Sequence, residues 1–209
     1  MPKWPSFAPP CDDPRVRLVL ASGSPARLRL LREAGFDPEV VVSGVDESGV
    51  TGDAGYVVRT LAERKAAAVA AAVGEGALVV GCDSMLLLDG VLHGKPSGPE
   101  EAVARWHAMR GREGTLLTGH CVVDTTSGRR ASAAGSTLVR FGTPTDAELD
   151  AYIRTGEPSN AAGAFTLDGR SAPFVDSIDG DHGNVIGLSL PLLRRLLGEL
   201  GVSVVDLWA

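Results

Sequence analysis

The segment Ser22-Gly23-Ser24-Pro25-Ala26-Arg27 follows an apolar run at residues 16–20 and precedes a leucine-bearing stretch. This order predicts a strand, a loop of small residues and the first turn of a helix, as is typical of an α/β fold. Ser24 suits a helix N-cap, and Pro25 suits the first helical position. The helix start offers unpaired backbone N–H groups, which favour an anion such as phosphate. An ordinary strand–helix turn is the alternative interpretation.

Arg27 favours the anion-binding interpretation because it falls in the same predicted first turn. The helix dipole disfavours a cation there unless a bound anion compensates for it. We therefore expect Ser22, Ser24 and Arg27 to form part of a substrate-binding loop.

The composition is that of an ordinary globular protein. Of the 209 residues, 44% are hydrophobic and 22% are charged, which allows a sizeable core in one domain or two lobes. The formal net charge of −6 argues against a protein that coats nucleic acid, since that function requires a surplus of Lys and Arg. No apolar stretch approaches the roughly 20 residues that cross a bilayer, so no membrane partner is expected.

The start of the chain and the cysteines predict a cytoplasmic location. Residues 1–14 are rich in proline and lack the apolar core of a secretory signal, so we expect a flexible tail there and a single domain at residues 15–209. The three cysteines include no close pair, which fits a reducing compartment better than a disulfide framework. Cys82 and Cys121 are expected to be small buried residues.

Alternating apolar patterns predict helices and strands along the whole chain. Capping boxes are predicted from Ser97 to Glu100 and from Thr145 to Glu148. Residues 157–184 are expected to be rich in loops. The expected helices are 25–34, 56–73, one ending near 109, one ending near 154, and 190–200, and the expected strands are 40–43, 77–81, around 116–123 and around 136–141. This alternation indicates an α/β fold whose two lobes share a central cleft.

Asp89-Gly90 lies between two apolar runs and predicts a two-residue hairpin turn. Counting back from the turn pairs Leu88 with Val91, Leu86 with His93, and Ser84 with Lys95. The predicted register therefore brings Lys95 beside Asp83.

Three basic residues and one carboxylate stand out as candidates for chemistry: Arg27, Lys65, Lys95 and Asp83. Asp83 interrupts an apolar strand, where a charge is costly to bury unless it is paired, so we expect it to face a cleft with cations nearby. The alternatives are that Asp83 only ends a strand and that Lys65 is a solvated helix lysine.

Seven short motifs together resemble the Maf nucleotide pyrophosphatases, in that family's order and over about residues 18–197. They are Leu20-Ala21-Ser22-Gly23-Ser24-Pro25-Ala26-Arg27, Val45-Asp46-Glu47, Glu63-Arg64-Lys65-Ala66, Gly81-Cys82-Asp83-Ser84, Gly94-Lys95-Pro96, Ala162-Gly163-Ala164-Phe165 and Asn184-Val185-Ile186-Gly187-Leu188. The resemblance implies a two-lobed, mixed-sheet fold related to the inosine triphosphate pyrophosphatases. It also implies cleavage of a nucleoside triphosphate to the monophosphate and pyrophosphate, a divalent metal, a cytoplasmic location and a homodimer.

The resemblance assigns roles to individual residues. Asp83 matches the catalytic aspartate, which would orient or deprotonate the water that attacks the α-phosphorus. Arg27, Lys65 and Lys95 match basic residues suited to binding the triphosphate and stabilising the departing pyrophosphate. Glu47 matches an acidic position that would join Asp83 in holding Mg²⁺ or Mn²⁺.

Substrate specificity is predicted to depend on Ala26, Ser84 and Asp168. The resemblance implies arginine, threonine and glutamine at these positions in a thymidine and uridine triphosphate branch, and tryptophan, glutamine and glutamate in a 7-methylguanosine triphosphate branch. This chain matches neither. Ala26 leaves space for a larger or modified base, and Asp168 offers an acceptor suited to N–H groups such as those of guanine.

Three functions follow as hypotheses. The first is a pyrophosphatase of nucleoside triphosphates, including modified or non-standard ones. The second is a narrow pyrophosphatase of methylated nucleotides such as 7-methyl-GTP. The third is a nucleotide-sensing regulator of cell division with little turnover, against which the intact Asp83 and Lys95 argue.

Overall fold

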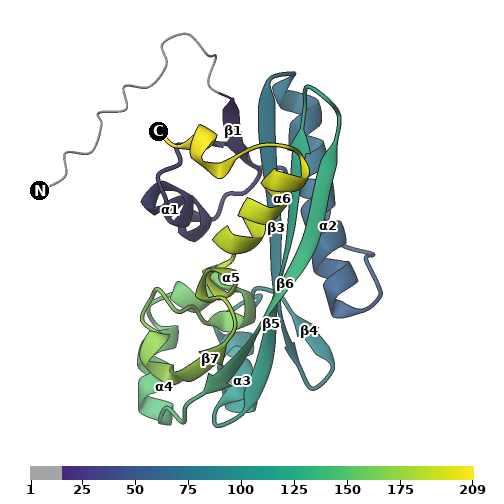
Figure 1. Ribbon diagram of the computed structural model, residues 1–209. Coiled ribbons are helices and arrows are strands. Elements are labelled where there is room, and N and C mark those ends of the chain that lie inside the picture. The colour runs from purple at the N-terminus through teal and green to yellow at the C-terminus, as the bar shows by residue number, and fades with distance from the viewer. Residues whose placement is uncertain (1–15) are drawn as a thin grey trace, which may run out of the picture.

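A computed structural model describes residues 16–209, which form one mixed β-sheet with helices on both faces (Figure 1). The flexible tail predicted for residues 1–14 lies outside the described residues. The seven strands follow the order β2-β1-β3-β5-β6-β7, and β4 pairs with β3. Their bounds are β1 Arg17–Leu20, β2 Glu39–Val40, β3 Ala77–Leu88, β4 Val91–His93, β5 Glu113–Asp124, β6 Arg130–Phe141 and β7 Val175–Asp179.

The strand β1 pairs in parallel with β2 and β3, whereas all other pairs are antiparallel. The α-helices are α1 Pro25–Glu33, α2 Ala54–Val73, α3 Pro99–Met109, α4 Asp146–Ile153, α5 His182–Ile186 and α6 Leu190–Glu199. Short 3₁₀ turns, η1 Glu157–Asn160, η2 Ala162–Ala164, η3 Ala172–Phe174 and η4 Val204–Leu207, complete the described chain.

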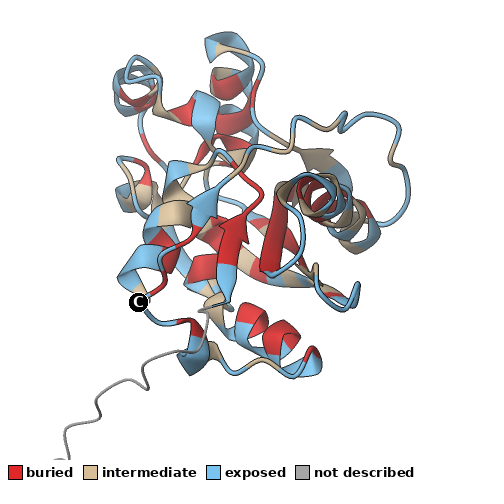
Figure 2. Cartoon of the chain, turned by 90° about the horizontal axis from the view of Figure 1, so that it is seen from above, coloured by how far each residue is buried: buried red, intermediate tan, exposed pale blue. Residues whose placement is uncertain are grey.

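Alternation along the strands places the helices on the two faces of the sheet. Leu18, Leu20 and Leu78 belong to a core with α1 and α6, whereas Val19 and Val79 pack with α2. Successive strand residues point to opposite faces, so α2 covers the face opposite α6. Figure 2 shows the buried residues on the strands and on the helix sides that face them.

Two lobes are built along the same sheet. The long strands β3, β5 and β6 run through both, with α1 and α6 packed near one end and α3 and α4 near the other (Figure 1). The second lobe has its own core around the buried indole of Trp106, where Phe141, Tyr152 and Phe174 pack edge-on. The predicted two-lobed α/β fold with a mixed sheet is therefore confirmed.

The predicted end of a strand at Cys82-Asp83-Ser84 is wrong, because β3 continues without a break to Leu88. Every backbone position of this segment stays paired with β5, including Asp83 with Gly119 and Ser84 with Thr118. The ladder satisfies the backbone, so the carboxylate interrupts the apolar pattern without ending the strand.

The hairpin and capping predictions have mixed outcomes. Leu88 pairs with Val91 and Leu86 with His93 as predicted, with positive φ at Asp89 and Gly90. The strand β4 ends at His93, so the ladder does not extend to Lys95. The Thr145–Glu148 capping box is present, whereas Ser97 bonds to Glu101 rather than to the predicted Glu100.

The described helices include none long and apolar enough to cross a membrane. Cys82 and Cys121 are buried free thiols, as predicted.

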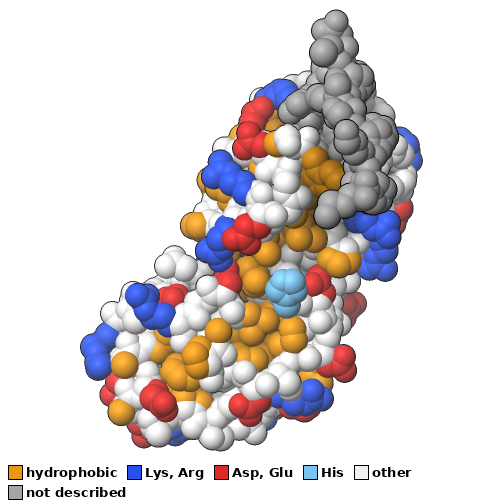
Figure 3. Space-filling model, turned by 60° about the vertical axis from the view of Figure 1, so that its left-hand side comes forward, with side chains coloured by type: hydrophobic (Ala, Val, Ile, Leu, Met, Phe, Trp, Pro, Cys, Tyr) orange, Lys and Arg blue, Asp and Glu red, His pale blue; other side chains and the backbone are white. Residues whose placement is uncertain are grey.

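On the face seen in Figure 3, Lys and Arg side chains are interspersed with Asp and Glu and with hydrophobic groups, so that face carries charges of both signs.

Candidate active site

A cavity of about 940 Å³ lies between the lobes and brings together all ten residues singled out from the sequence. Its walls come from the β1–α1 loop, α1, the β2–α2 segment, α2, β3, the segment after β4, the loops after α4, and α5. The ten residues are Ser22, Ser24, Ala26, Arg27, Glu47, Lys65, Asp83, Ser84, Lys95 and Asp168.

The β1–α1 loop has the predicted helix cap. Ser24 Oγ accepts a hydrogen bond from the Arg27 backbone N–H, and Pro25 occupies the first helical turn. Ser22 Oγ accepts from the Ser24 N–H at 3.2 Å. These bonds fix the small-residue loop at the edge of the cavity.

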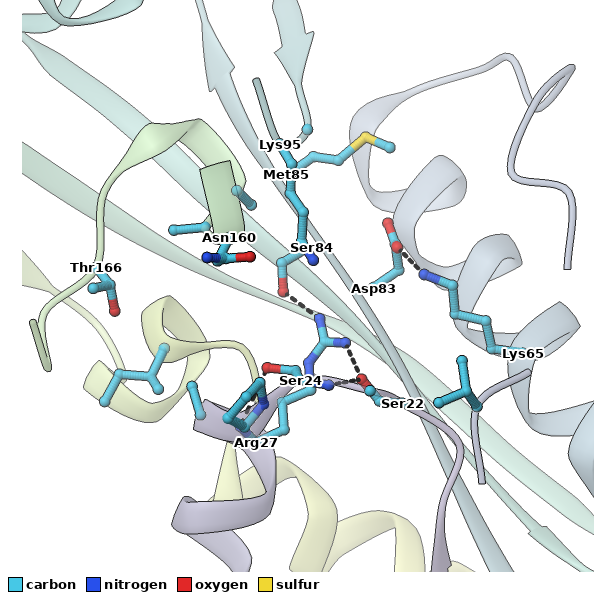
Figure 4. A pocket seen from close by; sticks show the side chains of 18 of the residues that line it. Ser22, Ser24, Arg27, Lys65, Asp83, Ser84, Met85, Lys95, Asn160 and Thr166 are labelled. Atoms are coloured by element: carbon cyan, nitrogen blue, oxygen red, sulfur yellow. Dashed lines mark hydrogen bonds and ion pairs between the residues drawn. The ribbon is translucent and has the colours of Figure 1, made fainter. Parts of the chain in front are cut away.

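The guanidinium of Arg27 is clamped by three segments of the chain. It donates to Ser22 Oγ at 2.9 Å and to Ser84 Oγ at 3.0 Å (Figure 4). It also donates to the Gly187 carbonyl at 2.8 Å. A guanidinium has five N–H donors, so two remain for an anion in the cavity. Gly187 belongs to a motif noted in the sequence, but its contact with Arg27 spans 160 positions and had no local signal.

Ser84 belongs to a directed chain of hydrogen bonds. Thr118 Oγ1 donates its single proton to the Asn184 carbonyl at 2.8 Å. The 2.9 Å bond between Thr118 and Ser84 must therefore use the Ser84 proton. Ser84 accepts from Arg27 and donates to Thr118, so in this arrangement its hydroxyl orients the arginine.

Lys65 lies between two carboxylates. Its Nζ is 2.6 Å from Asp83 Oδ1 and 2.7 Å from Glu47 Oε1 (Figure 4 draws the first pair). Lys65 and Asp83 are 9% and 5% exposed, so Lys65 is not a solvated helix lysine.

Asp83 has one engaged and one unengaged oxygen. Within residues 16–209, its buried Oδ2 has no hydrogen-bond partner. Burial raises the pKa of Asp83, and the Lys65 ammonium opposes that change. A carboxylate that lines a cavity and has an unengaged oxygen is suited to accepting a proton from a bound molecule.

Comparison with known proteins decides the family. The sequence pattern of the Maf-like protein family matches residues 17–200. This chain belongs to the Maf-like family.

Several curated relatives of this Maf-like chain carry the name nucleoside triphosphate pyrophosphatase. The Streptomyces coelicolor protein is 67% identical over 198 residues, which cover 94% of this chain and 96% of that protein. The Gloeothece citriformis protein is 48% identical over 194 residues, which cover 92% of this chain and 98% of that protein. Among solved structures, the Staphylococcus aureus Ham1 protein is 16% identical with a TM-score of 0.43, covering 60% of this chain and 72% of that chain.

Lys95 of this Maf-like chain lines the cavity but is not placed as the hairpin register predicted. It is an exposed residue that lies two positions beyond the end of β4. In the described part of the chain, the ammonium group paired with Asp83 is that of Lys65, and no salt bridge joins Lys95 to Asp83. Counting along an extended hairpin failed because the chain leaves the ladder at Gly94.

The predicted specificity residues line the same cavity with different surroundings. The Asp168 carboxylate pairs with Arg29 on α1 and accepts a hydrogen bond from Thr166 Oγ1. Arg29 was not singled out from the sequence, since its partner lies 139 positions away. Ala26 lines the same cavity and adds only a methyl group to its wall.

Proposed function

We propose that this Maf-like chain hydrolyses nucleoside triphosphates to the monophosphate and pyrophosphate. The observation that carries the proposal is the free Oδ2 of buried Asp83 in a cavity that Arg27, Lys65 and Lys95 also line. Basic groups match the charge of a triphosphate, and the unengaged oxygen can accept a proton from water. The names of the curated relatives support the same reaction.

The reaction balances with these groups. Asp83 takes a proton from water, whose oxygen attacks the α-phosphorus. A new oxygen–phosphorus bond forms, the bond from the α-phosphorus to the bridging oxygen breaks, and pyrophosphate leaves. Lys65, Arg27 and Lys95 stabilise the negative charge that builds on the leaving group.

Mg²⁺ or Mn²⁺ is proposed as cofactor, with Glu47 and Asp83 as its protein ligands. Both carboxylates contact Lys65 Nζ, so they are close enough to share one cation. Residues 16–209 contain no cluster of three or more His, Cys, Asp or Glu that could hold a metal. Two carboxylates fit these ions, which usually keep waters and bind substrate phosphates. When bound, the ion would neutralise phosphate charge.

The proposed substrates include nucleotides with a larger or modified base, because Ala26 leaves space and Asp168 offers an acceptor. A narrow preference for a methylated nucleotide such as 7-methyl-GTP is the second candidate. A nucleotide sensor with little turnover is the third. The three candidate functions predict different sets of triphosphates from which the protein releases pyrophosphate.

Pyrophosphate release from a panel of standard and modified nucleoside triphosphates tests the proposal. With Mg²⁺ or Mn²⁺, the wild type should release pyrophosphate, and Asp83→Asn should lower kcat/KM by about 10²- to 10⁴-fold because it removes the general base. Asp150→Asn makes the same chemical change at an exposed aspartate outside the cavity and should retain activity. Nucleotide binding without pyrophosphate release by the wild type would contradict the enzyme and favour the sensor.

A cytoplasmic location and a homodimer are also proposed. The free thiols of Cys82 and Cys121 suit a reducing compartment. The molar mass from light scattering tests the dimer, since one chain has a mass of 21.7 kDa.

A further inference from the structure

Arg105 is a nearly buried charge outside the cavity. Its side chain is only 4% exposed, although arginine is rarely buried without a partner. Removal from water lowers the pKa of Arg105, which means that burial opposes the charged form. Its partners must offset this cost, and they are the Gly94 carbonyl at 2.5 Å and the Glu101 carboxylate.

Both partners of Arg105 act on the segment that carries Lys95. Gly94 immediately precedes Lys95, and its carbonyl also accepts the Gly163 N–H at 3.0 Å. Glu101 accepts the Ser97 N–H at 2.8 Å and the Ser97 hydroxyl at 2.7 Å. One pair of α3 residues, spaced i and i+4, therefore holds both ends of the stretch from Gly94 to Ser97.

Lys95 lies inside this anchored stretch and lines the cavity. Pro96 beside it is buried, whereas Lys95 itself is exposed, so the backbone is fixed and only the lysine side chain is free. Fixing the backbone limits the entropy lost when a flexible ammonium binds a ligand.

We propose that Arg105, with Glu101, is a positioning residue that holds the Lys95 ammonium where it binds the triphosphate. The inference rests on the proposed function for the role of Lys95. It adds a residue that touches no substrate and acts through the backbone of Gly94. A merely structural Arg105 would stabilise the second lobe without any link to Lys95.

A double-mutant cycle separates these two roles. The affinity for inorganic tripolyphosphate, measured by calorimetry, is compared among wild type, Arg105→Met, Lys95→Ala and the double variant. Tripolyphosphate carries three phosphates and no base, and its binding requires no turnover. We expect each single variant to bind about 10- to 100-fold more weakly and the double variant to match Lys95→Ala within about twofold.

Two further variants guard against a general loss of structure. Arg105→Lys keeps a charged donor and should recover part of the affinity. Glu101→Gln changes a side chain that is 43% exposed, so it should lower the affinity for tripolyphosphate less than Arg105→Met does. In the Lys95→Ala background, Glu101→Gln should not lower this affinity further. The circular dichroism spectra of all variants should match the wild type.

The inference is overturned if the losses from Arg105→Met and Lys95→Ala simply multiply, if Arg105→Met binds tripolyphosphate normally, or if the wild type does not bind it. An unfolded Arg105→Met leaves Glu101→Gln to decide by the same criterion. Failure of the proposed function is distinct, since the wild type would then bind tripolyphosphate but release no pyrophosphate from nucleotides.

Discussion

At the residue scale, the site places one buried ammonium group between two carboxylates. Lys65 faces Asp83 and Glu47 at once, whereas Asp83 uses only one of its two oxygens for this contact. A buried ion pair usually needs its remaining lone pairs satisfied. The unsatisfied oxygen of Asp83 therefore destabilises the folded state. Such a group is typical of a residue with a chemical role.

His120 provides a residue-scale prediction about pH and stability. Its Nε2 accepts the Ser189 N–H at 2.8 Å, and its Nδ1 lies 3.0 Å from the Thr118 carbonyl, so the buried ring is neutral. Burial lowers its pKa from 6.5 to about 4. As the pH falls, His120 of the unfolded chain binds a proton before His120 of the folded chain does. The contribution of the neutral ring to the free energy of unfolding is therefore complete above about pH 6.5 and is lost toward pH 4. The loss is about 3 kcal/mol.

The free energy of unfolding, measured with urea from pH 4 to pH 7, tests this contribution of His120 to stability. His120→Gln should be less stable near pH 7 but should lose less stability on acidification than the wild type. Parallel curves for the two proteins would contradict the assignment. Other titrating groups, Asp83 included, are common to both proteins, so the difference between the curves isolates His120.

The residue types at the site could be read from the sequence, but their partners could not. A carboxylate in an apolar run identified Asp83, since burying a charge is costly. The contacts of Arg27 with Gly187 and of Arg29 with Asp168 depend on how distant segments pack. Local spacing contains no information about such contacts.

At the element scale, the close packing of α2 on the sheet brings Lys65 to Asp83. A Cβ at Gly119 would lie 2.0 Å from the Val58 carbonyl oxygen, and one at Gly81 would lie 2.4 Å from the Ala62 carbonyl oxygen. Real Cβ atoms do not approach backbone so closely, so glycine is required at both points. The two glycines let α2 lie directly on β3 and β5.

Gly119→Ala should therefore push α2 away from the sheet. We expect a loss of about 3 kcal/mol or more in stability and a fall in Tm of about 6 to 12 °C. Gly198→Ala is the matched control, because its Cβ would meet nothing within 4 Å and alanine favours the helix α6. A Gly119→Ala protein with the Tm of the wild type would refute the packing argument, which thermal unfolding checks directly.

Element types were more predictable than element ends. Periodicity and capping residues placed α1, α2 and α6 to within about two residues. The strand β7, with only partly buried and exposed residues, has no apolar alternation and was missed. The continuation of β3 past Asp83 was also missed, because backbone pairing with β5 decides it rather than side-chain pattern.

At the scale of the whole molecule, one sheet supports two cores and places the cavity between them. The hydrogen bonds of the Arg27 guanidinium join α1 to β3 and to the end of α5, so they link segments from different parts of the chain. The alternation of strands and helices predicted this two-lobed plan. Local sequence patterns singled out Ser22, Ser24, Arg27, Lys65, Asp83 and Lys95, and the family resemblance added Glu47, Ala26, Ser84 and Asp168. Only the fold brings these ten residues together in one cavity.

The most direct test of attack at the α-phosphorus is hydrolysis in water enriched in ¹⁸O, followed by mass spectrometry of both products. Attack at the α-phosphorus places the new oxygen in the nucleoside monophosphate in a single turnover and leaves the pyrophosphate unlabelled. Label in the pyrophosphate, or release of orthophosphate in its place, would rule out attack at the α-phosphorus.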